Sequence, residues 1–237
     1  YLKRTLKKNK KNSSYVAELV QSYCWNYDWH ETLTLLAGLM DQPMVLIAAI
    51  AAEKDDIFQT QLLLAGRCLA ECSQISDPLI DKLIDRIYQL WLKYPEAEFI
   101  GSAVVVIGQT WVKVVQNLQT TLNDEDRTVR ENAVEALGQI GSDKAVNALI
   151  TALNHENSNV RGNAAQALGQ IGSDKAVDAL ITALNHEYSD VRGKAAEAFV
   201  RGKAAEALGQ IGSDTAVDAL ITAFNDQDST VGWESAQ

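Results

Sequence analysis

The sequence is poor in the residues that interrupt helices. Its 237 residues include only 3 prolines and 14 glycines. Proline breaks a helix and glycine costs about 1 kcal/mol in a helix interior, so this composition favours helices throughout. Because 47% of the residues are apolar, the chain can bury a sizeable core without disulfides or metals. We therefore predict an all-α protein.

Cysteines are also few, and apolar runs are short. The 3 cysteines, Cys24, Cys68 and Cys72, cannot all pair, and a structural zinc site needs about four converging ligands. We interpret them as buried thiols in a reducing environment and predict no metal site. The longest apolar runs, near 44–52 and 103–107, are too short to span a bilayer, and the first residues lack a secretory signal. The sequence therefore predicts a cytoplasmic protein with no membrane partner.

Charge is distributed unevenly along the chain. Six of the 21 basic residues lie in a basic N-terminal arm, residues 1–12, and the other 15 stand against 31 acidic residues in the remainder. Affinity for nucleic acid rests on lysine and arginine that neutralise phosphates, so we predict no nucleic-acid surface on the acidic body. For the arm itself, contact with nucleic acid or acidic lipid and a solvated helix end or linker both stay open.

A repeat of 31 residues occupies the second half of the chain. The segment 126–154 recurs with few changes at 157–185, and a degenerate first copy precedes it. A third copy, with a 9-residue insertion, ends at Asn225, and a truncated fourth copy stops at Gln237. We predict three parts: the basic arm (1–12), an irregular helical array (13–100) and the repeats (101–237).

Each repeat predicts two helices with one apolar stripe each. The two stripes of one repeat consist of Val129, Ala133, Ala136, Leu137 and Ile140, and of Ala145, Val146, Leu149, Ile150 and Leu153. Between them, Gly141 can end the first helix with positive φ, and Ser142 can cap the second. Because one helix pair cannot bury both stripes alone, the pattern predicts an α-solenoid of stacked antiparallel helix pairs.

The string VRGNAAQALGQIGSDKAVDALITAL, at 160–184, closely resembles the short HEAT-like repeats of the phycobilisome-lyase type. The resemblance covers about residues 124–237 and implies a HEAT-like superhelix. Such repeats occur in bilin lyases, in enzyme-maturation factors and as sensor arms of large signalling proteins. The fold that they imply is therefore compatible with several functions.

Two strings in the first half, WHETLTLLAGLM from Trp29 and DIFQTQLLLAGRCLAEC from Asp56, resemble part of a larger protein. They are similar to the helical segment that follows the nucleotide-binding domain in bacterial NACHT-type signal-transduction ATPases. This resemblance spans about residues 13–123 and implies the sensor or regulatory arm of a larger signalling ATPase. The missing initiator Met and a last helix that stops at Gln237 are what we expect of such a fragment.

The sequence offers no motif for catalysis. A phosphate-binding loop requires GxxxxGK[ST], and the sequence contains none. We therefore predict that the chain is not an enzyme and has no catalytic residue and no cofactor; an ATPase would lie in a domain outside it. The leading hypothesis is a protein–protein interaction scaffold. The alternative is a lyase-like or chaperone-like HEAT scaffold that holds a chromophore-bearing partner protein.

The polar side of the second helices is the candidate binding face, because these helices line the concave side of HEAT-type stacks. In successive repeats it consists of Lys144, Asn147 and Thr151; Lys175, Asp178 and Thr182; and Thr215, Asp218 and Thr222. It holds no aromatic residue and no arginine, the usual anchors of an interface, so a solvated face is the alternative. Aromatic anchors lie instead at Tyr23, Trp25, Tyr27 and Trp29, where we expect a core or helix-junction cluster.

A histidine and an arginine recur at equivalent positions of the repeats, and we interpret both as structural. The residues named here belong to the copy at 157–185 and the loop after it. His186 follows the second helix, where a cation is favoured by the helix dipole. Arg161 recurs together with Asp174 of the inter-helix turn, which suggests one rung in a ladder of ion pairs. Exposed pairs of this kind contribute about 0 to 1 kcal/mol each.

The 9-residue insertion duplicates part of a first helix. VRGKAAEAF at Val191–Phe199 is followed at once by VRGKAAEAL. These residues are mostly strong helix formers, so we predict one lengthened helix from near Ser189 to Gln210. Nine residues turn an α-helix by about 900°, which places the two copies about 180° apart. Because Leu208 adjoins the inter-helix turn, we expect the first copy to be displaced, with part of Val191 or Phe199 exposed.

The stripe assignment can be tested by stability. Leu168 belongs to an apolar stripe, and Thr182 belongs to the polar side. We expect Leu168→Ala to lower the free energy of unfolding by about 2–5 kcal/mol, because it empties a packed core position. Thr182→Ala should change it by less than about 0.5 kcal/mol. Urea unfolding measures both values, and equal midpoints would contradict the assignment.

Overall fold

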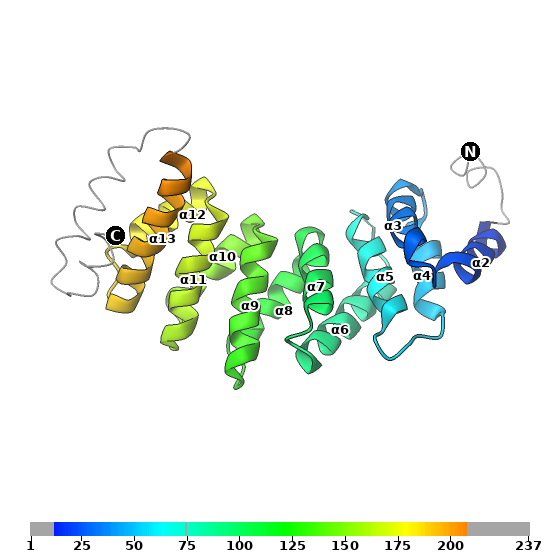
Figure 1. The fold of residues 1–237 in the computed structure, drawn as a ribbon, viewed down its shortest axis with the longest axis horizontal. Helices are drawn as coiled ribbons and strands as arrows, with labels where there is room; N and C mark the ends of the chain where they lie inside the picture. The colour runs from blue at the N-terminus through cyan, green and yellow to red at the C-terminus, as the bar shows by residue number, and fades with distance from the viewer. Residues whose placement is uncertain (1–11, 74, 208–237) are drawn as a thin grey trace. The chain divides into compact units, whose positions relative to one another are not determined.

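The structure, a computed structural model, describes residues 12–73 and 75–207 (Figure 1). Within these ranges every regular element is a helix, which confirms the predicted all-α fold. The chain forms two compact units, 1–114 (unit 1) and 115–237 (unit 2). The finer division at residues 12 and 100 stays a prediction. None of the described helices is long and apolar enough to cross a membrane.

Unit 1 is built around helix α5, which is buried on nearly every side. The helices of this unit are α2 (Asn12–Tyr23), the 3-10 helix η1 (Tyr27–Trp29), α3 (His30–Leu39), α4 (Pro43–Ala52), α5 (Thr60–Ala70), α6 (Pro78–Lys93) and α7 (Glu98–Thr110). Helix α5 contacts α3, α4, α6 and α7. Its Leu62, Leu64 and Leu69 are buried, as expected of a helix that is apolar on several faces.

The C-terminal end of α5 is joined to the C-terminal end of α7. The last carbonyls of a helix have no partner inside the helix and need one outside it. Trp111 Nε1 donates to Leu69 O at 3.0 Å, and Thr110 Oγ1 donates to Ala70 O at 2.8 Å. These two bonds satisfy carbonyls at the end of α5 and fix α7 against it.

Unit 2 consists of stacked helix pairs. After α8 (Val112–Thr121), which begins in unit 1, its helices are α9 (Arg127–Ile140), α10 (Asp143–Ala152), α11 (Ser158–Ile171), α12 (Asp174–Ala183) and α13 (Ser189–Ala207). Gly141 ends α9 with φ 60°, and Ser142 caps α10 by accepting from Ala145 N at 3.4 Å. Gly172, φ 62°, and Ser173 do the same for α11 and α12. The turn chemistry predicted from the repeat is therefore present twice.

The first helices of the pairs, α9, α11 and α13, lie side by side (Figure 1). Small residues permit this close approach. A Cβ atom built on Gly138 would lie 3.2 Å from Ala167 Cβ, and one built on Gly169 would lie 2.7 Å from Ala198 Cβ. Leu168 is fully buried in this layer, whereas Thr182 on α12 is exposed, in agreement with the stripe assignment.

The 9-residue insertion lies within one continuous helix, α13, which runs from Ser189 to Ala207. The predicted lengthened helix is confirmed over this range; its predicted end at Gln210 and the side chain of Phe199 lie outside the described residues. The expected displacement of the first copy is wrong, because Val191 is fully buried. The preceding loop fixes the register: Arg192 Nη1 donates to His186 O at 2.9 Å, as the equivalent arginines do in the earlier copies.

Two glycines of α11 provide a matched test of the close approach. We expect Gly169→Ala to lower the free energy of unfolding by about 1–3 kcal/mol, because its Cβ would also lie 3.0 Å from Ala198 O. Gly162→Ala should raise it by about 0.5–1 kcal/mol, since the nearest atom, Lys194 Cγ, is 3.5 Å away. Urea unfolding compares the two variants. A gain in stability from both would show that α11 and α13 are not in tight contact.

Candidate functional site

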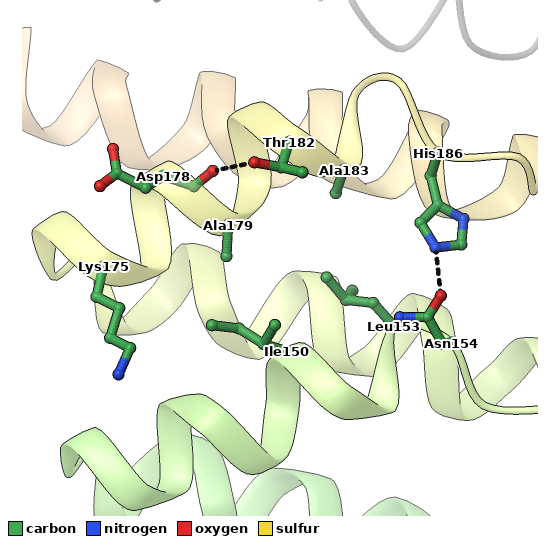
Figure 2. Close-up of a pocket in the computed structure, with 9 residues that line it drawn as sticks. All are labelled: Ile150, Leu153, Asn154, Lys175, Asp178, Ala179, Thr182, Ala183 and His186. Atoms are coloured by element: carbon green, nitrogen blue, oxygen red, sulfur yellow. Dashed lines mark hydrogen bonds between the residues drawn. The ribbon is translucent and has the colours of Figure 1, made fainter.

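The candidate site is a groove between the second helices α10 and α12 of unit 2, with a volume of about 340 Å³ (Figure 2). Its lining residues are Ile150, Leu153, Asn154, Lys175, Asp178, Ala179, Thr182, Ala183 and His186. Such a volume is within the range of small ligand sites, about 300–1,000 Å³. The groove is open to solvent along the polar side that the sequence singles out.

Apolar side chains form the floor of the groove. Ile150 and Leu153 project from the α10 side toward the short side chains of Ala179 and Ala183 on α12 (Figure 2). An apolar floor with a few polar groups around it is the usual composition of a binding pocket. The floor therefore favours an apolar group as the part of a ligand that enters.

The rim of the groove carries groups of both charges. Lys175 and Asp178 lie toward one end, and the linked pair of His186 and Asn154 lies at the other (Figure 2). Lys175 and Asp178 are exposed and make no ion pair within the described residues. Their charges are therefore available to a ligand.

Helix packing explains why a groove forms here. The Gly–Ala contacts draw α11 close to α9 and α13, whereas α10 and α12 touch each other much less. Alanine at 179 and 183 leaves space opposite the larger side chains of α10. The groove is thus a consequence of unequal packing in the two layers of unit 2.

The predicted binding face is only partly gathered in this groove. Lys175, Asp178 and Thr182 line it. Lys144, Asn147 and Thr151 are exposed on α10 but are not among its lining residues. Thr215, Asp218 and Thr222 lie outside the described residues. The Thr182 hydroxyl donates to Asp178 O at 2.9 Å, so its proton is used inside the helix and its lone pairs remain free to accept.

His186 links two repeats through its ring nitrogens. Its Nδ1 accepts from Tyr188 N at 3.2 Å, and its Nε2 lies 3.1 Å from Asn154 Oδ1. The ring thus bonds to its own loop and to the preceding repeat, and its interpretation as a cation stays a prediction. The same arrangement recurs between His155 and Asn123, at 3.1 Å. This Asn–His spacing is the sequence signal that could have identified the link.

Arg161 does not form the expected ion pair with Asp174, which is exposed in the inter-helix turn. Its Nη1 donates to His155 O at 2.8 Å and to Glu156 O at 2.9 Å. Its Nε and Nη2 donate to the two carboxylate oxygens of Asp190 at 3.0 and 3.1 Å. The expected ladder is wrong because the guanidinium reaches back to its own loop and across to the next repeat.

The aromatic residues near Trp25 lie at the surface of the junction between α2 and α3, where Tyr23 stacks on Trp29. The helix-junction alternative therefore holds, and the core alternative is wrong. Tyr23 is 36% exposed, Trp25 46% and Tyr27 74%, while Trp29 is half-buried. Cys24 and His30 of the same segment are buried. The burial of Cys24 and His30 at the two ends of this exposed turn was not recognised from the sequence.

The thiols of unit 1 are buried. Burial raises the pKa of Cys68 to about 12 and that of Cys72 to about 11, and it also raises the pKa of Cys24. In the described part of the chain, no group of three or more His, Cys, Asp or Glu side chains is placed to hold a metal ion. The geometry therefore agrees with structural thiols.

Residues 114–200 match the family model of HEAT repeats, and residues 200–226 match the PBS lyase HEAT-like repeat. The second half of the chain is therefore similar to HEAT repeats, in agreement with its sequence pattern. No curated protein matches the sequence. The resemblance of the first half to NACHT-type ATPases stays a prediction.

Several solved structures are similar to the chain at low identity. An engineered protein is 19% identical, with a TM-score of 0.34 over 95% of this chain. Human deoxyhypusine hydroxylase in complex with glycerol is 20% identical, with a TM-score of 0.41 over 99% of this chain. A Pds5–Scc1 complex is 12% identical, with a TM-score of 0.47 over 95% of this chain. The chain spans 66%, 86% and 45% of these proteins, respectively.

The thiol environment predicts slow alkylation. The thiolate is the reactive form, and at pH 8 a pKa of about 12 leaves Cys68 almost entirely protonated. We expect iodoacetamide to modify Cys68 at least about 100-fold more slowly in the folded chain than in urea. Mass spectrometry after timed quenching measures the rate. Rapid, stoichiometric labelling of the folded chain at Cys68 would contradict this account.

Proposed function

We propose that this chain is a non-catalytic protein-interaction scaffold that binds a partner protein in the groove between α10 and α12. The observation that carries the proposal is the apolar floor of Ile150, Leu153 and Ala179 beneath an exposed rim with Lys175 and Asp178. A scaffold of HEAT repeats is compatible with this role, and the groove supplies a defined place for it.

The occupant that best fits the groove is a short segment of a protein with one bulky apolar side chain. The floor accepts the apolar group, and the volume of about 340 Å³ leaves room for little more than the anchor and its neighbours. Lys175 and Asp178 can pair with carbonyl and amide groups, or with charges of both signs, on the same segment. The Thr182 oxygen can accept a further hydrogen bond.

The rim favours binding over catalysis. Acid–base and nucleophilic groups in active sites owe their perturbed reactivity to burial and to close charged partners. In this groove the charged side chains, Lys175 and Asp178, are exposed. The Thr182 hydroxyl is engaged with its own helix, which leaves it poorly placed to act as a nucleophile.

Two wider settings accommodate such a scaffold. The strings that begin at Trp29 and Asp56 support the sensor or regulatory arm of a NACHT-type signalling ATPase in the cytoplasm. The match of residues 200–226 to the PBS lyase HEAT-like repeat supports the second setting, a lyase-like or chaperone-like scaffold for a chromophore-bearing protein. Both settings use the same groove as a protein-binding surface.

A substitution that fills the groove tests the proposal. Thr182 is exposed, so Thr182→Arg can cover the floor without disturbing the core. Peptides selected from a random phage-displayed library on the purified chain would be synthesised, and their affinity measured by fluorescence polarisation. We expect Thr182→Arg to weaken binding at least about tenfold, as loss of a central anchor does.

A matched control separates the groove from the general surface. Gln170 is exposed on α11 and is not among the lining residues, and Gln170→Arg adds the same charge. The selected peptides should bind this variant as they bind the parent chain. If Thr182→Arg and Gln170→Arg bind them equally well, the groove is not the binding site.

A further inference from the structure

The turn between α2 and α3 exposes a cluster of aromatic rings, here called the aromatic turn and defined as Tyr23–Glu31. Tyr23, Trp25 and Tyr27 are 36%, 46% and 74% exposed. Tyr23 stacks on Trp29, with ring centroids 4.0 Å apart and an angle of 23° between the planes. The rings thus form a local surface on unit 1.

Hydrogen bonds hold the aromatic turn in one conformation. Cys24, fully buried, offers its carbonyl to His30 Nε2 at 2.8 Å and to Gln61 Nε2 at 3.2 Å. Asn26 Oδ1 accepts from Asp28 N at 3.0 Å and so caps η1. The exposed rings of Trp25 and Tyr27 therefore lie between two buried residues, Cys24 and His30, that fix the turn. Binding to rings that are already ordered costs less conformational entropy.

The stretch of sequence that contains the aromatic turn carries charge of one sign. From Ser13 to Glu53 the sequence contains no lysine and no arginine, but it contains the acidic residues Glu18, Asp28, Glu31, Asp41 and Glu53. Asp28 and Glu31 are exposed within the turn itself. Their field attracts cations to the same place where the rings present their electron-rich faces.

Two tyrosines elsewhere in the chain already make cation–π contacts with basic side chains. Arg161 lies over the Tyr188 ring at 4.2 Å from its centroid, and Lys93 lies over the Tyr94 ring at 5.2 Å. Among the described residues, Trp25 and Tyr27 have no such cation. Cation–π contacts of this kind contribute most with tryptophan and tyrosine and with the arginine guanidinium.

From this combination we infer that the aromatic turn binds arginine-bearing segments of a partner protein. Guanidinium groups stack on Trp25 and Tyr27, while Asp28 and Glu31 supply opposite charge at the edge of the same surface. Arginine fits better than lysine because its planar, weakly hydrated group both stacks on rings and pairs with carboxylates. This surface is separate from the groove of unit 2 and does not depend on it.

Nucleic acids and anionic membranes do not fit this surface. Both present phosphates, which the exposed carboxylates of Asp28 and Glu31 would repel. A neutral apolar partner would gain from the rings but would leave the acidic edge unused. An arginine-rich peptide can contact both the rings and the carboxylates. It is therefore the partner that best fits this surface.

The inference is tested with fluorescein-labelled octa-arginine and octa-lysine peptides and the full chain. Fluorescence polarisation gives the affinity at low and high salt. We expect tighter binding of octa-arginine, and a loss of about 2- to 5-fold in its affinity for each of Trp25→Leu and Tyr27→Leu. Tyr27→Phe keeps the ring and should retain the affinity of the parent chain.

Matched variants separate ring recognition from general attraction to an acidic protein. Phe99 is also an exposed aromatic of unit 1, at 44%, and Phe99→Leu should leave the affinity unchanged. The double variant Asp28→Asn, Glu31→Gln should weaken binding mainly at low salt. Circular dichroism on heating verifies that each variant is folded. Equal affinity of the parent chain and the Trp25→Leu, Tyr27→Leu double variant would overturn the inference, whatever the effect of the charge variants.

Discussion

The close approach of the first helices is the constraint on which unit 2 depends. Gly169 and Ala198 stand so close that a single added Cβ would meet Ala198 at 2.7 Å. Larger residues at these positions would separate the helices and expose the stripe that includes Leu168. The second helices α10 and α12 contact each other much less. The packing that stabilises the stack therefore also opens the groove.

Arg161 shows how one repeat is joined to the next. A buried guanidinium is costly unless its donors are satisfied, and here it bonds two carbonyls of its own loop and both oxygens of Asp190. The position of Asp190 is occupied by Asn159 one repeat earlier, so Arg130 has no carboxylate there. The contact that this arginine makes to the next repeat therefore differs between repeats whose sequences are almost identical.

The sequence was informative about local structure and less informative about contacts between helices. Caps such as Gly141 and Ser142, and buried positions such as Leu168, follow from residue type and spacing, and the structure confirms them. The groove floor was not predicted because the position of Ile150 in the apolar stripe is typical of a core residue. How far Ile150 is exposed depends on the distance between α10 and α12, which the sequence pattern does not give. The expected displacement of the first copy was wrong because the loop before Val191 holds this copy in the register of the earlier repeats.

Tyr188 and Tyr27 present the same chemistry in two different settings. Tyr188 is the exposed large aromatic among the described residues of unit 2, and its ring already lies against Arg161. That contact is internal: it helps to hold a buried arginine between two repeats. In unit 1 the rings of Trp25 and Tyr27 are held by buried neighbours but meet no cation within the described residues. A cation from another molecule would complete there the arrangement that unit 2 makes within its own chain.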